Sequence, residues 1–64
     1  MKIADVQRLL LRRCTEAGGQ AAFARSHGLA KGYISQVLNG QRPPSAKLCA
    51  ALGVREDGMR WVRA

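Results

Sequence analysis

The sequence predicts a mainly α fold, a compact bundle of four helices followed by a short C-terminal strand or helix. Apolar residues recur at steps of three and four residues along most of the chain, which is the period of an amphipathic helix. Glycines stand where these segments end, and glycine readily takes the left-handed conformation that closes a helix. The chain has 64 residues, of which 47% are hydrophobic. This length and composition allow residues 1–64 to form a single domain with a small core.

The first helix is predicted over residues 3–16. Its apolar positions follow the helical period: Ile3, Val6, Leu9, Leu10 and Cys14. Asp5 lies in the first turn, where a negative charge suits the helix dipole. Gly18 and Gly19 are expected to end this helix.

The second helix is predicted from Gln20 to about residue 26 or 27, with Phe23 as its large core residue. Gly28 supplies a turn, and Leu29 can enter the core directly after it. Two helices joined so tightly must cross steeply. Residues 20–39 therefore have the form of a helix-turn-helix.

The third helix is predicted over residues 31–38, with Ile34, Val37 and Leu38 facing inward. Its opposite face is polar and contains no carboxylate: Lys31, Gly32, Tyr33 and Gln36, with Ser35 at the border. Such a face suits contact with base edges and phosphates, and a helix presented in this way fits the major groove of DNA.

After the closing pair Asn39 and Gly40, residues 41–44 form a rigid polar loop. Ser45 is a good N-cap for a fourth helix, which Gly53 should end. Its apolar stripe comprises Leu48, Cys49, Ala51 and Leu52. In the tail, residues 55–58 are predicted as a polar turn and residues 59–63 as a short extended strand, with a short helix as the alternative.

The charge of the chain points to an anionic partner. Eleven Lys and Arg residues against four acids give a formal charge of +7, which favours nucleic acid over a merely solvated basic surface. Three aromatic residues are too few for a binder that stacks single-stranded bases. No apolar run approaches the roughly 18 residues of a membrane span, and no signal peptide is evident, so we expect a cytoplasmic protein.

Metal and cofactor sites are not expected. Cys14 and Cys49 lack a CxxC spacing, and His27 is the sole histidine, whereas structural zinc usually needs four such ligands. Both cysteines are predicted to be reduced core residues, with a disulfide as the alternative. Four acids and one histidine provide no evident catalytic set, and the domain is too small for a large pocket, so an enzyme or a small-molecule binder is not expected.

An ordered set of residues resembles the helix-turn-helix signature of the Cro and repressor DNA-binding domains of temperate phages. The set comprises Gln20, Ala24, Gly28, Ile34, Val37, Asn39 and Gly40. The later segments 44–45 and 50–54 look like the fourth helix of that family, so the resemblance covers roughly residues 3–54. Ala30 departs from the family pattern, which usually has a Ser or Thr cap at this position. Gly32 inside the third helix and the polar His27 are further departures.

The resemblance implies specific contacts with double-stranded DNA. Base contacts fall on Lys31, Gly32 and Gln36, with Tyr33 beside them. Phosphate contacts fall on Gln20 and on the loop residues Asn39, Gln41 and Arg42, and we add Ser35 from the border of the polar face. Gln20 and Asn39 also have a simpler interpretation as helix-end polar groups.

The predicted function is that of a Cro-like transcriptional regulator, most simply a repressor, in a bacterial or phage-infected cell and associated with the nucleoid. A homodimer would bind a pseudo-palindromic operator. Met59, Trp61 and Val62 are the predicted dimer contact, although Trp61 could instead cover the core of its own monomer. One alternative is a DNA-binding antitoxin or autoregulator whose main partner is a protein. The other is a non-specific basic nucleic-acid binder.

Overall fold

The computed structural model describes residues 1–58 and 60–64, so the predicted contact at Met59 lies outside the described residues. Within these residues the chain is mainly helical, with a small antiparallel sheet of two strands, which confirms the predicted mainly α class. The elements are α1 (Ile3–Ala17), α2 (Gln20–Ser26), α3 (Lys31–Leu38), α4 (Ala46–Leu52), β1 (Val54–Asp57) and β2 (Arg60–Arg63).

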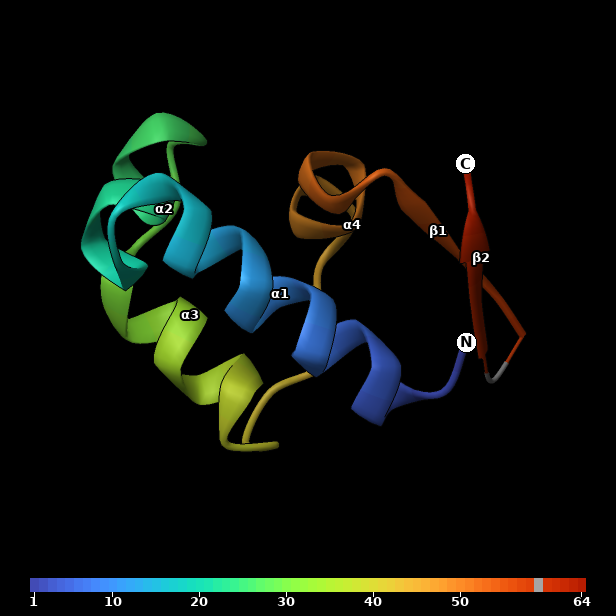
Figure 1. Cartoon of the computed structure of the whole chain (residues 1–64). Coiled ribbons are helices and arrows are strands. Elements are labelled where there is room, and N and C mark those ends of the chain that lie inside the picture. The colour runs from blue at the N-terminus through green and yellow to red at the C-terminus, as the bar shows by residue number, and fades with distance from the viewer. Residues whose placement is uncertain (59) are drawn as a thin grey trace.

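The helix α1 crosses the middle of the molecule (Figure 1). On one side of it lie α2 and α3, and at the other end lie α4 and the hairpin of β1 and β2. Val6, Leu10 and Cys14 form its inward stripe, and each is at most 2% exposed. They belong to one buried cluster with residues of every helix and of β1: Phe23, Ala24, Ile34, Val37, Leu48, Cys49, Leu52 and Val54.

The helix ends follow the sequence signals. At the end of α1, Gly18 is in the left-handed region with φ of 98°, and the N–H of Gly19 donates to the carbonyl of Cys14 at 2.7 Å. At the start of α4, Ser45 Oγ accepts a hydrogen bond from the N–H of Leu48 at 3.2 Å. Gly53 closes α4, as predicted.

The predicted turn at residues 55–58 is wrong in part. Arg55, Glu56 and Asp57 belong to β1, which pairs with β2 in the register Val54 with Arg63 and Asp57 with Arg60. The chain reverses only after Asp57. Residues 55–57 have exposed, charged side chains, so the sequence shows no alternation of apolar and polar residues that would predict a strand. Main-chain pairing and the buried side chain of Val54 hold the strand in place instead. Residues 60–63 are extended, as predicted, and not helical.

The strand β2 is tied to the first residue of the chain. The N–H of Trp61 donates to the carbonyl of Met1 at 2.8 Å, and the amino nitrogen of Met1 donates to the carbonyl of Trp61. The ring of Trp61 is half-buried against the core, which is the alternative to a dimer contact that the sequence left open. The hairpin is therefore attached to both α1 and α4.

Cys14 and Cys49 are both buried and free, which confirms the prediction of reduced core thiols. Burial raises the pKa of the Cys14 thiol. For Cys49, burial and then the negative charge of Glu56 raise the pKa, against a smaller opposing effect of the Trp61 indole. In the described residues no helix has the length and apolarity to cross a membrane.

The cap of α4 gives a direct test of the fold. Ser45→Ala should lower the free energy of unfolding by about 1 kcal/mol, because the N–H of Leu48 loses its side-chain acceptor. Urea unfolding followed by circular dichroism measures the change. Ser26→Ala is the matched control, since Ser26 Oγ only donates to the carbonyl of Ala22 on an exposed helix. Equal effects of the two substitutions would contradict the capping role.

Candidate nucleic-acid interface

The turn between α2 and α3 is built around Gly28. Gly28 has a φ of 65°, and a Cβ there would stand 3.2 Å from Lys47 Nζ. Next to it, the N–H of Leu29 donates to the carbonyl of Ala24 at 2.7 Å, which closes α2. Lys47 on α4 donates to the carbonyl of Gly28 at 3.0 Å. Hydrogen bonds from the adjacent residue Leu29 and from Lys47 of α4 therefore both stabilise this turn.

The helix α3 has one buried and one accessible side. Ile34 and Val37 are completely buried and fix its rotation against α1. Lys31 and Gly32 are exposed, while Ser35 and Gln36 are half-buried. The structure therefore brings Lys31, Gly32 and Gln36 to one helix, on which they remain accessible beside the buried face.

Tyr33 is placed differently from its predicted neighbours. Its ring is half-buried against the core. Its hydroxyl donates to the carbonyl of Pro43 at 3.2 Å and accepts from the N–H of Ser45 at 2.6 Å. These two bonds join the hydroxyl to the main chain at Pro43 and Ser45, so Tyr33 links α3 to the loop before α4.

The last turn of α3 is fixed by a residue that the sequence reasoning missed. Gln7 on α1 donates from Nε2 to the carbonyl of Val37 at 3.0 Å. The N–H of Gln41 donates to the carbonyl of Gln36 at 2.8 Å. In the sequence, Gln7 is recognisable only as a polar residue beside the apolar stripe of α1. This position does not indicate which residue Gln7 contacts. The side chains of Asn39, Gln41 and Arg42 remain exposed around this end.

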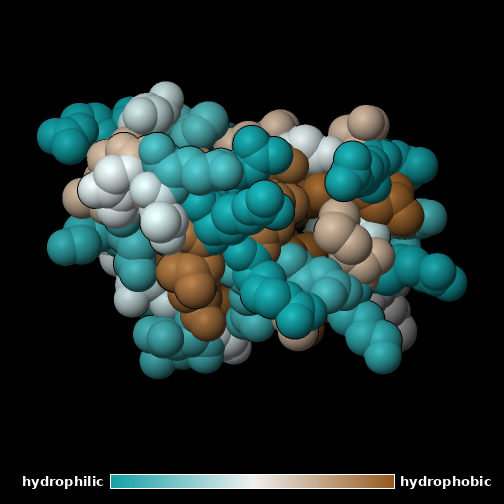
Figure 2. All heavy atoms as spheres, viewed as in Figure 1, coloured by the Kyte–Doolittle hydropathy of each residue, from teal (hydrophilic) through white to brown (hydrophobic). Residues whose placement is uncertain are grey.

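Gln20 begins α2 and is half-buried, and its side chain forms no hydrogen bond with the part of the chain that the structure describes. It lines a shallow hollow of about 470 Å³ together with residues of α1 and α3: Ala4, Gln7, Arg8, Leu11 and Leu38. Leu11 is 52% exposed, and apolar atoms break the polar surface beside α1 and α3 (Figure 2). Leu11 is not among the residues that the sequence predicts for the site.

The first turn of α3 has no side-chain cap. Ala30 occupies the N-cap position with extended backbone and cannot accept a hydrogen bond through its side chain. Gly32, in the same turn, has open space where a Cβ would stand. The first turn of α3 therefore lacks a capping side chain at residue 30 and any side chain at residue 32.

Acidic residues are absent from the middle of the chain, residues 17–53, and are confined to the segments on either side of it. Residues 17–53 contain Arg25, Lys31, Arg42 and Lys47 and no acidic residue. All four acids lie in α1 and β1: Asp5, Glu16, Glu56 and Asp57. The segment that contains α2 and α3 therefore carries positive side chains and no negative one.

Two of these acids already have basic partners on α1. Asp5 Oδ1 lies 2.7 Å from Arg8 Nη2, and Glu16 Oε2 lies 3.9 Å from Arg12 Nε. The hydrogen bond from the N–H of Lys2, followed by that from Arg8, lowers the pKa of Asp5. These acids are consequently poor counter-charges for the cations around α3.

The predicted dimer contacts that the structure describes lie away from this surface. Trp61 and Val62 are half-buried in the hairpin, at the opposite end of the molecule from α3 (Figure 1). His27 is exposed, as predicted, with its ring centroid 4.5 Å from that of Phe23. Trp61 and Val62 thus lie at the opposite end of the fold from the predicted DNA-contacting residues of α3.

No protein-family model matches the chain, and no match was found among curated proteins or among solved structures.

Tyr33→Phe should loosen the loop while it keeps the ring in the core. Loss of the two hydroxyl bonds should lower the free energy of unfolding by about 0.5–1.5 kcal/mol. It should also speed amide hydrogen exchange at Ser45, whose N–H loses its acceptor. Unchanged exchange at Ser45, measured by NMR, would contradict the linking role of Tyr33.

Proposed function

We propose that this protein is a sequence-specific double-stranded DNA-binding transcriptional regulator of the cytoplasm, most simply a repressor. In this proposal residues 20–39 act as a helix-turn-helix, and α3 enters the major groove. Lys31, Gly32 and Gln36 contact base edges, while Gln20, Ser35, Asn39, Gln41 and Arg42 contact phosphates.

One observation is the main support for the proposal. A helix with an accessible polar side follows a tight turn, in a region of 37 residues, 17–53, that contains cations and no carboxylate. DNA presents phosphates on both sides of its major groove, so any acid on this surface would oppose binding. The acids of the chain lie in α1 and β1 instead.

The loop after α3 supports a phosphate-contacting role. It is anchored by Tyr33 and by the backbone bond between Gln41 and Gln36, while the side chains of Gln41 and Arg42 stay exposed. An anchored loop with free polar side chains can hold a phosphate in a fixed relation to the helix. Such contacts set the register of α3 on the duplex.

Tyr33 has a changed role in this proposal. Because its hydroxyl is already bonded to residues 43 and 45, Tyr33 positions the loop in this proposal. We further propose a homodimer whose two-fold axis matches a pseudo-palindromic site. The hairpin is the candidate contact, through Val62 on the face opposite to Trp61.

Gln36→Ala should relax base preference at one symmetric position of the bound site. A bidentate amide contact to adenine contributes about 1–3 kcal/mol of discrimination, which alanine cannot supply. Selection of bound duplexes from a random pool, followed by binding curves on single-base variants, measures the change. Gln41→Ala is the matched control, because a phosphate contact should weaken binding without altering base preference. Unaltered preference in Gln36→Ala would remove direct readout by this residue.

Arg42→Ala should weaken binding to all duplex sequences alike. The slope of log K against log salt is negative, and its magnitude should decrease by about 0.9 for each phosphate that the protein no longer neutralises. Arg60→Ala, in the distant hairpin, offers an arginine control that should leave this slope unchanged. Fluorescence anisotropy at several salt concentrations gives both slopes, and equal slopes for the wild type and Arg42→Ala would argue against a phosphate contact.

A further inference from the structure

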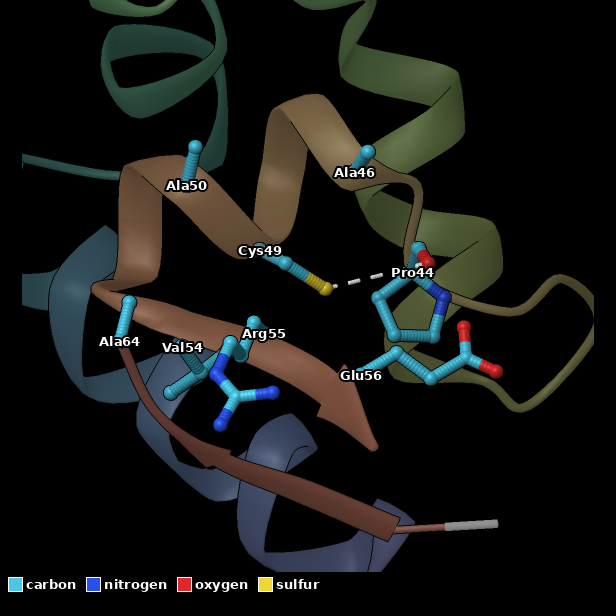
Figure 3. A pocket seen from close by; sticks show the side chains of 8 residues that line it. All are labelled: Pro44, Ala46, Cys49, Ala50, Val54, Arg55, Glu56 and Ala64. Atoms are coloured by element: carbon cyan, nitrogen blue, oxygen red, sulfur yellow. Dashed lines mark hydrogen bonds between the residues drawn. The ribbon is translucent and has the colours of Figure 1, made fainter. Parts of the chain in front are cut away.

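A second surface lies between α4 and the outer edge of β1, away from α3. It is a cavity of about 440 Å³ with Arg55 and Glu56 at its rim. Small or apolar residues of α4, of its two flanks and of the segment after β2 line it: Pro44, Ala46, Cys49, Ala50, Val54 and Ala64. Figure 3 shows β1 between α4 and β2, with the Cys49 thiol facing the space between α4 and β1. The proposed DNA contacts make no use of this cavity.

The edge of β1 that faces the cavity has free main-chain groups. Trp61 directs its N–H and C=O to Met1, away from β1. Its cross-strand partner Glu56 is therefore in a non-hydrogen-bonded pair and directs its own N–H and C=O away from β2. By alternation Val54 does the same, and among the described residues neither has a hydrogen-bond partner on that side. Such an edge can accept another strand.

A second copy of the chain is a poor occupant of this edge. Antiparallel pairing of two β1 strands about a two-fold axis perpendicular to the sheet permits two central registers. One places Arg55 directly opposite its own copy. The other pairs Arg55 with Asp57 of the copy, but it places Glu56 directly opposite its own copy beside the apolar lining of the cavity. Like charges directly opposite each other destabilise a strand pair.

The side chains define the occupant that does fit. A residue opposite Glu56 would share the inner face and lie against Ala46, Cys49 and Ala50, so it must be apolar. A residue opposite Arg55 would lie on the outer face, where an acid complements the guanidinium. The chain's charge of +7 also favours an acidic partner.

We propose that the groove between α4 and β1 binds an extended segment of a partner protein in which apolar and acidic residues alternate. The segment adds as an antiparallel strand to β1. Its apolar residues bond through their main chain to Glu56 and Val54, and its acidic residues face Arg55. This interaction is independent of the proposed DNA binding, because α3 does not line the groove.

The probe is a fluorescein-labelled hexapeptide of alternating valine and aspartate, added to the intact protein without DNA and followed by anisotropy. Glu56→Pro removes the edge N–H without removing a bond between β1 and β2, and it should weaken binding at least tenfold. Glu56→Thr removes the same carboxylate but keeps the N–H, so its affinity should stay within about threefold of the wild type. Circular dichroism verifies that both variants are folded.

Modified peptides test the geometry without altering the protein. N-methylation of the valine amides should abolish binding, because these N–H groups face β1, whereas N-methylation of the aspartate amides should not. Arg55→Glu should lose the aspartate peptide and gain a peptide of alternating valine and lysine. These results together would establish strand addition at this edge.

Three outcomes would overturn the proposal. The first is no binding of the peptide at 1 mM, and the second is equal binding by the wild type and Glu56→Pro. The third is a dimer that Glu56→Pro converts to monomer in sedimentation, since a second copy would then occupy the edge. DNA is absent from every sample, so failure here leaves the DNA-binding proposal unaffected, and the reverse also holds.

Discussion

The buried stripe of α1 is the constraint on which the rest of the structure depends. A chain of 64 residues buries only about 60% of the surface that its unfolded form exposes, so it can form one small core. Val6, Leu10 and Cys14 supply the central line of that core, and α1 contacts α2, α3, α4 and β2. Because Ile34 and Val37 pack into the same cluster, the stripe also fixes which side of α3 is accessible.

Local signals explain why the helices could be predicted and the turn of the hairpin could not. Gly18 and Ser45 act on the backbone within three to five residues of their own positions, so the sequence reveals their effect directly. In β1, by contrast, Arg55, Glu56 and Asp57 are exposed and follow no apolar alternation. Their strand depends on pairing with residues 60–63 across the turn and on the single anchor Val54, and neither is a property of the local sequence.

The same distinction applies to the candidate interface. Exposure of Lys31 and Gly32 follows from the helical period once Ile34 and Val37 face inward. Tyr33 lies in the same polar arc, but its ring has enough apolar surface to enter the core and its hydroxyl reaches the loop at Pro43. Gln7 reaches Val37, 30 residues away, and a contact of that range has no local signature in the sequence.

The two ends of α3 are held unequally, and this difference bears on the proposed readout. At its end, Gln7 and Gln41 bond to carbonyls of the last turn, and Tyr33 secures the following loop. At its start, an alanine replaces a capping side chain, at a cost of about 1 kcal/mol, and Gly32 adds roughly 0.5–1 kcal/mol relative to alanine. In the proposed complex, Gln36 would therefore read its base from a position that several hydrogen bonds hold, whereas Lys31 would contact DNA from a first turn that has no side-chain cap. Discrimination between sequences would then depend mainly on the second half of the helix, which Gln7 and Gln41 hold in place.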